Sequence, residues 1–204
     1  MTLRLNRRRT VAPVLGLAAA LLLVACRPGA GFGSGAPSDP ESASPASASV
    51  APTATASESL GPFACSFPLT GTATVGRAQI TDLRVAAHDG YDRIVFEFAA
   101  GQPAYTISTA TPPLTRDPSG LPMTVAGSTF LAIVLQGGTA VTPDGTSTYS
   151  GPSDFTPNLA RVAQLVQAGD FEAVSSWYVG LTGTACVRVL TLADPSRLVI
   201  DIEH

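Results

Sequence analysis

The sequence Asp92-Arg93-Ile94-Val95-Phe96-Glu97-Phe98 decides the fold, because large apolar residues alternate in it with charged ones. Successive side chains of a strand point to opposite faces, so Ile94, Phe96 and Phe98 share one face and Arg93 and Glu97 the other. One apolar and one charged face are typical of an antiparallel strand that packs on a core and contacts water on its other side. The segment therefore predicts a β-sheet domain.

The C-terminal segment Arg197–Glu203 repeats this pattern. Leu198, Ile200 and Ile202 are expected to point inward, and Arg197, Asp201 and Glu203 outward. We expect the acids at 97, 201 and 203 to form a solvated ladder of opposite charges with Arg93 and Arg197, since such pairs stabilise neighbouring strands.

Further strands are predicted between turn residues such as Asp89-Gly90 and Asp144-Gly145. They are Gln79–Ala86, Ala104–Thr109, Thr129–Gln136, Phe171–Leu181 and Ala185–Leu192. The stretch Leu159–Val166 fits a strand or one short helix, and a strand is favoured; Gly169-Asp170 is interpreted as the turn into Phe171. The predicted fold class is mainly β, an antiparallel β-sandwich or a partly closed barrel.

The aromatic residues give the first candidates for ligand contact. In Phe171–Leu181, alternation places Phe171 and Trp177 on one side, so Trp177 is predicted to belong to the core. Tyr178 falls on the opposite side and is a candidate for an exposed contact. Tyr105 is a second candidate, provided that a cleft brings it near Tyr178 and the turn acids.

Three cysteines divide into two kinds. Cys26 ends the segment Leu23-Val24-Ala25-Cys26, considered below. Cys65 and Cys186 form an even pair, and in an oxidising compartment such a pair is most simply a disulfide. Two free thiols are the alternative.

The first 25 residues have the organisation of an export signal. Arg7-Arg8-Arg9 is followed by the uncharged run Val11–Ala25, which is shorter than the roughly 20 residues that span a bilayer. Leu23–Cys26 resembles the lipobox of bacterial lipoproteins, which implies cleavage before Cys26 and a lipid on its sulfur. An uncleaved signal anchor and a secretory signal cut elsewhere are the alternatives.

Composition separates a linker from the domain that follows. Residues 26–62 are mostly Ala, Ser, Pro, Gly and Thr and are predicted to be a disordered tether, and residues 63–204 the folded domain. After the basic head, eight Arg face fifteen Asp and Glu, and 8 − 15 = −7. A body of that charge repels phosphate backbones, so nucleic acid is excluded as the expected partner.

Several segments together resemble a known family. Ile80–Val85, Asp92–Phe98 and Pro195–Ile202 are similar to strands of the AMIN domain, and residues 79–204 resemble the AMIN-like domain of actinobacterial lipoproteins. His88–Arg93, Gly169–Glu172 and Val179–Leu181 also recur in that variant. The resemblance implies a β-sandwich, a location in the cell envelope, and a non-catalytic role in attachment or localisation at peptidoglycan.

The inventory of reactive residues is thin. The sequence has no Lys, only two His, and none of the Gly-x-Ser-x-Gly, Walker, HExxH or Cys-x-x-Cys motifs. His88 and Asp89, close to Asp92, invite a metal or acid–base interpretation, but Asp89-Gly90 is favoured as a hairpin turn. Asp117 and Asp144 are likewise interpreted as turn formers. We expect no catalytic residue, metal or cofactor, and keep His88 and Asp89 as candidate ligand contacts.

The sequence therefore predicts a lipid-anchored, extracytoplasmic binding module. Its expected partners are the membrane, through the anchor, and a cell-wall glycan or an envelope protein; the oligomeric state is left open. A scaffold or assembly factor for an envelope complex is one alternative. A small hydrolase that uses Asp or Glu is another.

Overall fold

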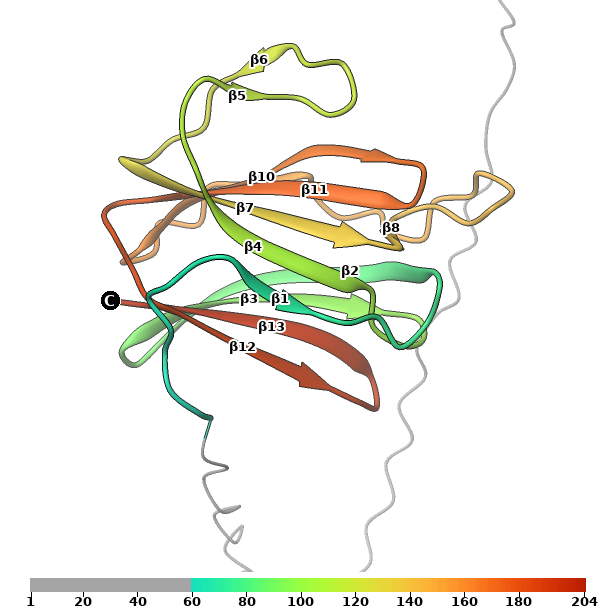
Figure 1. Cartoon of the computed structure of the whole chain (residues 1–204), viewed down its shortest axis with the longest axis horizontal. Coiled ribbons are helices and arrows are strands. Elements are labelled where there is room, and N and C mark those ends of the chain that lie inside the picture. Colours follow the sequence, from blue (N-terminus) through green and yellow to red (C-terminus); the bar gives the residue numbers. More distant parts are fainter. Residues whose placement is uncertain (1–59) are drawn as a thin grey trace, which may run out of the picture. The chain divides into compact units, whose positions relative to one another are not determined.

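The computed structural model describes residues 60–204, which form two packed β-sheets and a hairpin (Figure 1). The six-stranded sheet has the order β1-β4-β7-β11-β10-β9, and the five-stranded sheet the order β12-β13-β3-β2-β8. All neighbouring strands are antiparallel except β2 and β8. The predicted antiparallel sandwich is therefore confirmed.

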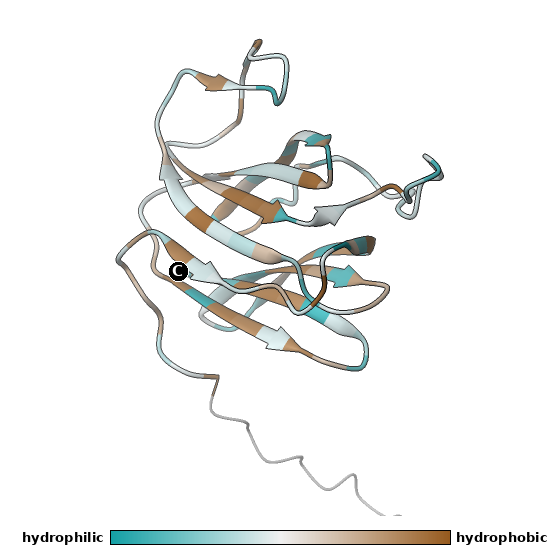
Figure 2. Cartoon of the chain, turned by 45° about the vertical axis from the view of Figure 1, so that its right-hand side comes forward, coloured by the Kyte–Doolittle hydropathy of each residue, from teal (hydrophilic) through white to brown (hydrophobic). Residues whose placement is uncertain are grey.

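The strands follow the alternation of apolar and polar residues, which Figure 2 shows as brown and pale or teal segments in turn along the strands. The six-stranded sheet is formed by β1 (Leu69–Gly71), β4 (Ala104–Ala110), β7 (Thr129–Gln136), β9 (Asp154–Phe155), β10 (Val162–Phe171) and β11 (Val174–Leu181). The five-stranded sheet is formed by β2 (Ala78–His88), β3 (Tyr91–Phe98), β8 (Gly138–Thr139), β12 (Val187–Leu192) and β13 (Ser196–Glu203). Within the described part of the chain, no helix is long and apolar enough to cross a membrane.

The core lies between the two sheets and is centred on an aromatic pair. The rings of Phe96 on β3 and Trp177 on β11 meet edge to face, with centroids 5.6 Å apart. The indole N–H of Trp177 donates to the hydroxyl of Ser175 at 2.9 Å, which satisfies the one polar atom of this buried side chain. The prediction that Trp177 belongs to the core is confirmed.

A hairpin that alternation did not predict lies on the outer face of the six-stranded sheet (Figure 1). It comprises β5 (Leu114–Thr115) and β6 (Pro122–Met123), and we call residues 111–128 the flap. A small second core fixes it to the sheet; its buried members are Leu114, Val125 and Val166, with Met123, Phe130 and Tyr178 packed against them.

Two glycines seat the flap on the sheet. A Cβ at Gly169 on β10 would overlap the carbonyl oxygen of Asp117, and a Cβ at Gly180 on β11 would overlap that of Ala126. Because both glycines lack a side chain, the two legs of the flap approach the sheet at backbone distance.

The structure corrects two predictions about β10 and β11. Leu159–Val166 leads into strand β10, in agreement with the strand that is favoured over a helix. However, β10 continues to Phe171, so Gly169 and Asp170 belong to the strand and do not form the predicted turn. The turn is formed by Glu172 and Ala173, both with positive φ, near +51° and +61°. Phe171 therefore pairs with Val174, on the face opposite Trp177, and its side chain is 52% exposed.

The expected signal segment 1–25, the lipid-attachment residue Cys26 and the tether up to residue 59 lie outside the described residues.

Candidate functional site

The four candidate contact residues lie at three separate places. His88 and Asp89 are exposed at the β2–β3 turn, where the imidazole stacks on the Tyr91 ring with centroids 5.0 Å apart. Tyr105 and Tyr178 belong to the same sheet but to opposite faces, because Tyr105 shares the inner face with Ile107 and Tyr178 lies opposite Ala132 on the outer face. No single cleft collects them.

Tyr105 is a packing residue. Its ring lies over Gly71 on the neighbouring strand β1, where a Cβ would overlap the ring. The same ring packs on the main core, and burial raises the pKa of its hydroxyl above the ordinary value. Tyr105 therefore fills the margin of the sandwich.

The side chain of Asp92 points away from the turn that carries His88 and Asp89. It points inward with Ile94 and is fully buried, and its Oδ2 accepts the backbone N–H groups of Arg161 at 2.6 Å and Val162 at 2.8 Å. Its Oδ1 lies 3.4 Å from Nε2 of His204. Asp92 thus joins the two sheets. Among residues 60–204, no group of three or more His, Cys, Asp and Glu side chains could hold a metal ion.

The disulfide between Cys65 and Cys186 is present, as predicted. It lies beside a pair of backbone hydrogen bonds between Ala64 and Val187, both 2.8 Å long. The covalent and hydrogen-bonded links together fix the start of the folded domain to the edge of β12.

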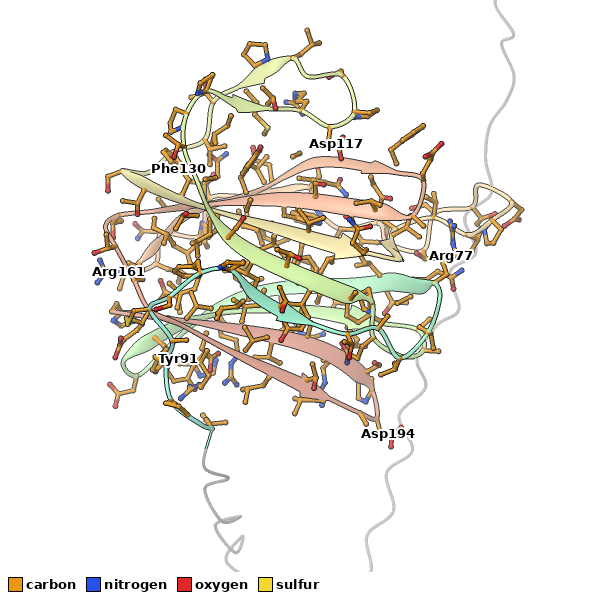
Figure 3. The ribbon with its side chains drawn as sticks, viewed as in Figure 1. Arg77, Tyr91, Asp117, Phe130, Arg161 and Asp194 are labelled. Atoms are coloured by element: carbon orange, nitrogen blue, oxygen red, sulfur yellow. A yellow bond between two sulfur atoms is a disulfide. The ribbon has the colours of Figure 1, made fainter. Side chains whose placement is uncertain are left out.

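A concave site with apolar walls lies at one end of the sandwich and has a cavity volume of about 520 Å³; we call it the end groove. Phe67, Phe130, Leu181 and the disulfide form apolar walls, and Arg161 and His204 add polar groups. Figure 3 shows Phe130 and Arg161 at this end. The Nε of Arg161 donates to the carbonyl of Glu203 at 3.2 Å, and within residues 60–204 its guanidinium forms no ion pair.

A second concave site lies between the flap and strands β7 and β11, with a volume of about 310 Å³; we call it the flap cleft. Its floor carries Tyr178, Ser176, Ala132 and Val134, which alternation directs to the outer face. Its roof is formed by the flap residues Thr115, Arg116, Asp117, Pro118 and Gly120. Tyr178 is half-buried, so packing under the flap holds the ring while part of it faces the cleft.

Polar groups converge beside that ring. The hydroxyl of Ser176 donates to Oδ2 of Asp117 at 3.2 Å, and the backbone N–H of Asp117 donates to the carbonyl of Ala168 at 2.9 Å. Figure 3 shows Asp117 between the flap and the sheet. Arg116 is exposed and, in the described part of the chain, forms no ion pair. An aromatic surface with donors and acceptors beside it suits a ligand that has both apolar and hydroxyl-bearing faces.

The charged face of the five-stranded sheet differs from the predicted ladder. Asp201 is fully buried there, between Arg93 and Arg188, with Nε–H to carboxylate distances of 2.6 and 2.9 Å. The Arg188 guanidinium lies over the Phe63 ring, 4.4 Å from its centroid. The prediction of a solvated Asp201 is wrong, because two long arginine side chains cover it. The hydrogen bond that the Arg93 guanidinium donates to the Asp201 carboxylate raises the pKa of Arg93.

Sequence reasoning missed Arg116, Asp117 and Ser176 as possible contacts. Asp117 was interpreted only as a turn former, and Ser176 only as a member of a strand. The available signal was the Pro- and Gly-containing stretch 112–122, whose lack of alternation indicates a segment laid over a sheet rather than paired within it.

Comparison with known proteins gives one match. The model of the AMIN-like domain family matches residues 78–204, which cover β2 to β13. No curated protein and no solved structure matches the chain.

Proposed function

The chain belongs to the AMIN-like domain family, and on this basis we propose that it is a non-catalytic module that binds a component of the cell envelope. AMIN-like domains are typically extracytoplasmic. The negative charge of the domain disfavours nucleic acid and anionic lipid surfaces as ligands, and so favours a ligand with a low density of negative charge.

In this proposal the membrane holds the module through Cys26. The lipobox-like Leu23–Cys26 after a basic and apolar segment supports attachment of a diacylglyceryl group to the thiol. Mass spectrometry of the native protein tests it: a mature chain that begins at a lipid-modified Cys26 is expected. A native chain that begins at an unmodified Met1 contradicts it. Membrane fractions that retain as much of the Cys26→Ser variant as of the native chain also contradict it.

The proposed ligand is the glycan of the cell wall, in the first place peptidoglycan. The observation that carries this proposal is the half-buried Tyr178 ring in the flap cleft, with the Asp117–Ser176 pair beside it. One face of a pyranose ring carries C–H groups that can lie on an aromatic ring, and its edge carries hydroxyls that hydrogen-bond to carboxylates and side-chain hydroxyls.

Sedimentation with purified peptidoglycan tests the glycan proposal. The detergent-extracted full-length chain is expected to sediment with insoluble peptidoglycan and to be released by soluble glycan strands. An unrelated lipoprotein in the same detergent serves as the control. Full-length chain that stays in the supernatant with the control protein contradicts the proposal.

A second candidate function is a scaffold for an envelope protein, and the end groove favours it. Apolar walls, and an Arg161 guanidinium that forms no ion pair within residues 60–204, suit a peptide segment with an acidic group. A photo-crosslinking residue at Phe130 tests this candidate in cells. A discrete protein adduct that Arg161→Gln abolishes supports it, and crosslinking to no protein contradicts it.

The absence of catalysis is also part of the proposal. In the described residues, the buried carboxylates of Asp92 and Asp201 are each held by several protein donors, which is typical of structural carboxylates. We therefore expect no turnover of wall polymers. If the native chain turns over wall polymers and Asp89→Asn or Glu97→Gln abolishes this activity, the protein is a hydrolase and the binding proposal is wrong.

A further inference from the structure

We propose that the outer face of the six-stranded sheet forms a linear track for an extended glycan chain, with Tyr178 at one end and Phe171 at the other. The inference rests on the proposed glycan function and deepens it. It assigns the class of ligand as a polymer of several sugar units and assigns the second contact, Phe171, to the β10–β11 hairpin.

The register of β10 and β11 places both aromatic residues on this face. Ser175 and Trp177 are buried in the core, so Val174, Ser176 and Tyr178 point outward. Phe171 lies directly opposite Val174 and therefore shares the outward direction. Tyr178, Ser176 and Phe171 thus lie along one side of a single hairpin.

The spacing exceeds the reach of one sugar. Phe171 is level with Val174, four residues from Tyr178 along β11, which corresponds to about 14 Å at about 3.4 Å per residue. A single pyranose ring cannot contact both aromatic side chains, whereas a chain of several linked rings can. The track therefore favours a polymer over a free sugar.

Polar groups occupy the interval between the two aromatic residues. Ser176 lies midway along β11, and its partner Asp117 projects from the flap above it. Arg116 precedes Asp117 and is free, within residues 60–204, to pair with a carboxylate of the ligand. The arrangement suits hydroxyls at the centre of the track and an acidic substituent at its rim.

The exposure of Phe171 is otherwise unexplained. Phe171 and Leu121 are the two large apolar residues that are mostly exposed in the described part of the chain, at 52% and 62%. The turn that carries Leu121 is hydrogen-bonded to β10: the N–H of Asp117 donates to the carbonyl of Ala168, which lies three residues before Phe171. Neither residue lines the flap cleft itself, so the proposal assigns Phe171 to the surface beyond the cleft.

The position of the track disfavours an extended peptide as ligand. β11 lies in the middle of its sheet, hydrogen-bonded to β7 on one side and to β10 on the other. Its backbone groups are therefore occupied, and no peptide can add as a further strand there. A ligand of this face must be bound by side chains, as a glycan chain would be.

The test measures how affinity depends on glycan length, using the full-length chain in detergent and β-1,4-linked N-acetylglucosamine oligomers of two and six units. The hexamer is expected to bind about tenfold more tightly than the dimer, the gain of one further well-packed contact. Phe171→Ala should remove this gain, so that the hexamer and the dimer bind this variant about equally. Tyr178→Ala should weaken both oligomers, and Tyr178→Phe, which keeps the ring, should retain binding. Phe63→Ala, which removes an aromatic ring beside the other sheet, is the matched control and should bind as the unaltered chain does.

Acid-bearing soluble peptidoglycan strands extend the test to Arg116. Arg116→Gln should weaken binding of these strands about threefold more than it weakens binding of the neutral oligomers, as expected for an exposed charge pair. Equal affinity for the two oligomers, or a Phe171→Ala variant that keeps the length dependence, overturns the track while the proposed glycan function stands. A native chain that binds neither oligomers nor strands overturns both.

Discussion

The carboxylate of Asp92 on β3 accepts the backbone N–H of Val162 on β10 at 2.8 Å, and so links the two sheets through a fully buried side chain. The same oxygen accepts the N–H of Arg161 at 2.6 Å. One carboxylate therefore satisfies two backbone donors at the start of β10, where the end groove begins.

Replacement of Asp92 with Ala should destabilise the domain by about 2–4 kcal/mol, because it leaves two backbone donors, one of them buried, without an acceptor. Asp92→Asn keeps one acceptor oxygen and should cost clearly less. Urea unfolding of both variants, followed by Trp177 fluorescence, measures the difference. Equal free energies of unfolding for Asp92→Ala and the native chain would show that water replaces the carboxylate at no cost.

Asp201 should be as important on the other face of the same sheet. Asp201→Ala leaves Arg93 and Arg188 without their shared carboxylate. We expect the free energy of unfolding to fall by about 2–4 kcal/mol. This is at the lower end of the range for buried ion pairs, because Arg93 keeps some exposure to water. The triple variant with Arg93→Met, Arg188→Met and Asp201→Leu should recover most of this loss. Thermal unfolding distinguishes the two; a triple variant less stable than Asp201→Ala would contradict the explanation.

The flap should depend on Gly169. Gly169→Ala introduces a Cβ that overlaps the Asp117 carbonyl, so the flap must move away from β10. Hydrogen exchange of the Asp117 amide, which donates to Ala168, should accelerate at least tenfold, while amides of β3 and β13 keep their protection. Gly76→Ala, where a Cβ would meet no neighbouring atom, is the control and should leave exchange of the Asp117 amide unchanged.

Tyr105 and Tyr149 should titrate at higher pH than a free tyrosine. Burial raises the pKa values of Tyr105 and Tyr149 above the ordinary value near 10, so the fold favours their neutral forms. This contribution to stability is complete below the pKa of the unfolded chain and is lost as the pH rises through the higher pKa of the folded chain. Absorbance near 295 nm should show a late phase that shrinks in Tyr105→Phe. A late phase that is as large in Tyr105→Phe as in the native chain would contradict the placement of this ring.

Alternation of apolar and polar residues predicted most of the strands, because a strand with one buried face shows this pattern within its own few residues. The segments that became β3, β7 and β13 are predicted nearly to the residue, since each has three large apolar residues in alternation on one face. The turn at Glu172 and Ala173 was missed because neither residue is a usual turn former, whereas Gly169 resembles one. Gly169 serves instead to admit the flap, a contact between segments about fifty residues apart that local sequence does not encode.

The candidate site was predicted only in part, for a related reason. Tyr178 was placed correctly on the outer face by its alternation with Trp177, but its neighbours Arg116 and Asp117 come from a flap without periodic pattern. The interpretation of Asp201 as solvated failed because outward direction does not imply exposure when two arginine side chains fold over a carboxylate. Such coverage depends on cross-strand register, which the sequence alone did not supply.

The most direct test of the binding account is NMR mapping on the full-length chain as it is titrated with the N-acetylglucosamine hexamer. The account predicts that amide shifts concentrate in the flap, residues 114–121, and in the β10–β11 hairpin, residues 168–178. Shifts confined to the end groove around Arg161 and Phe130, or spread over β12 and β13, would contradict it.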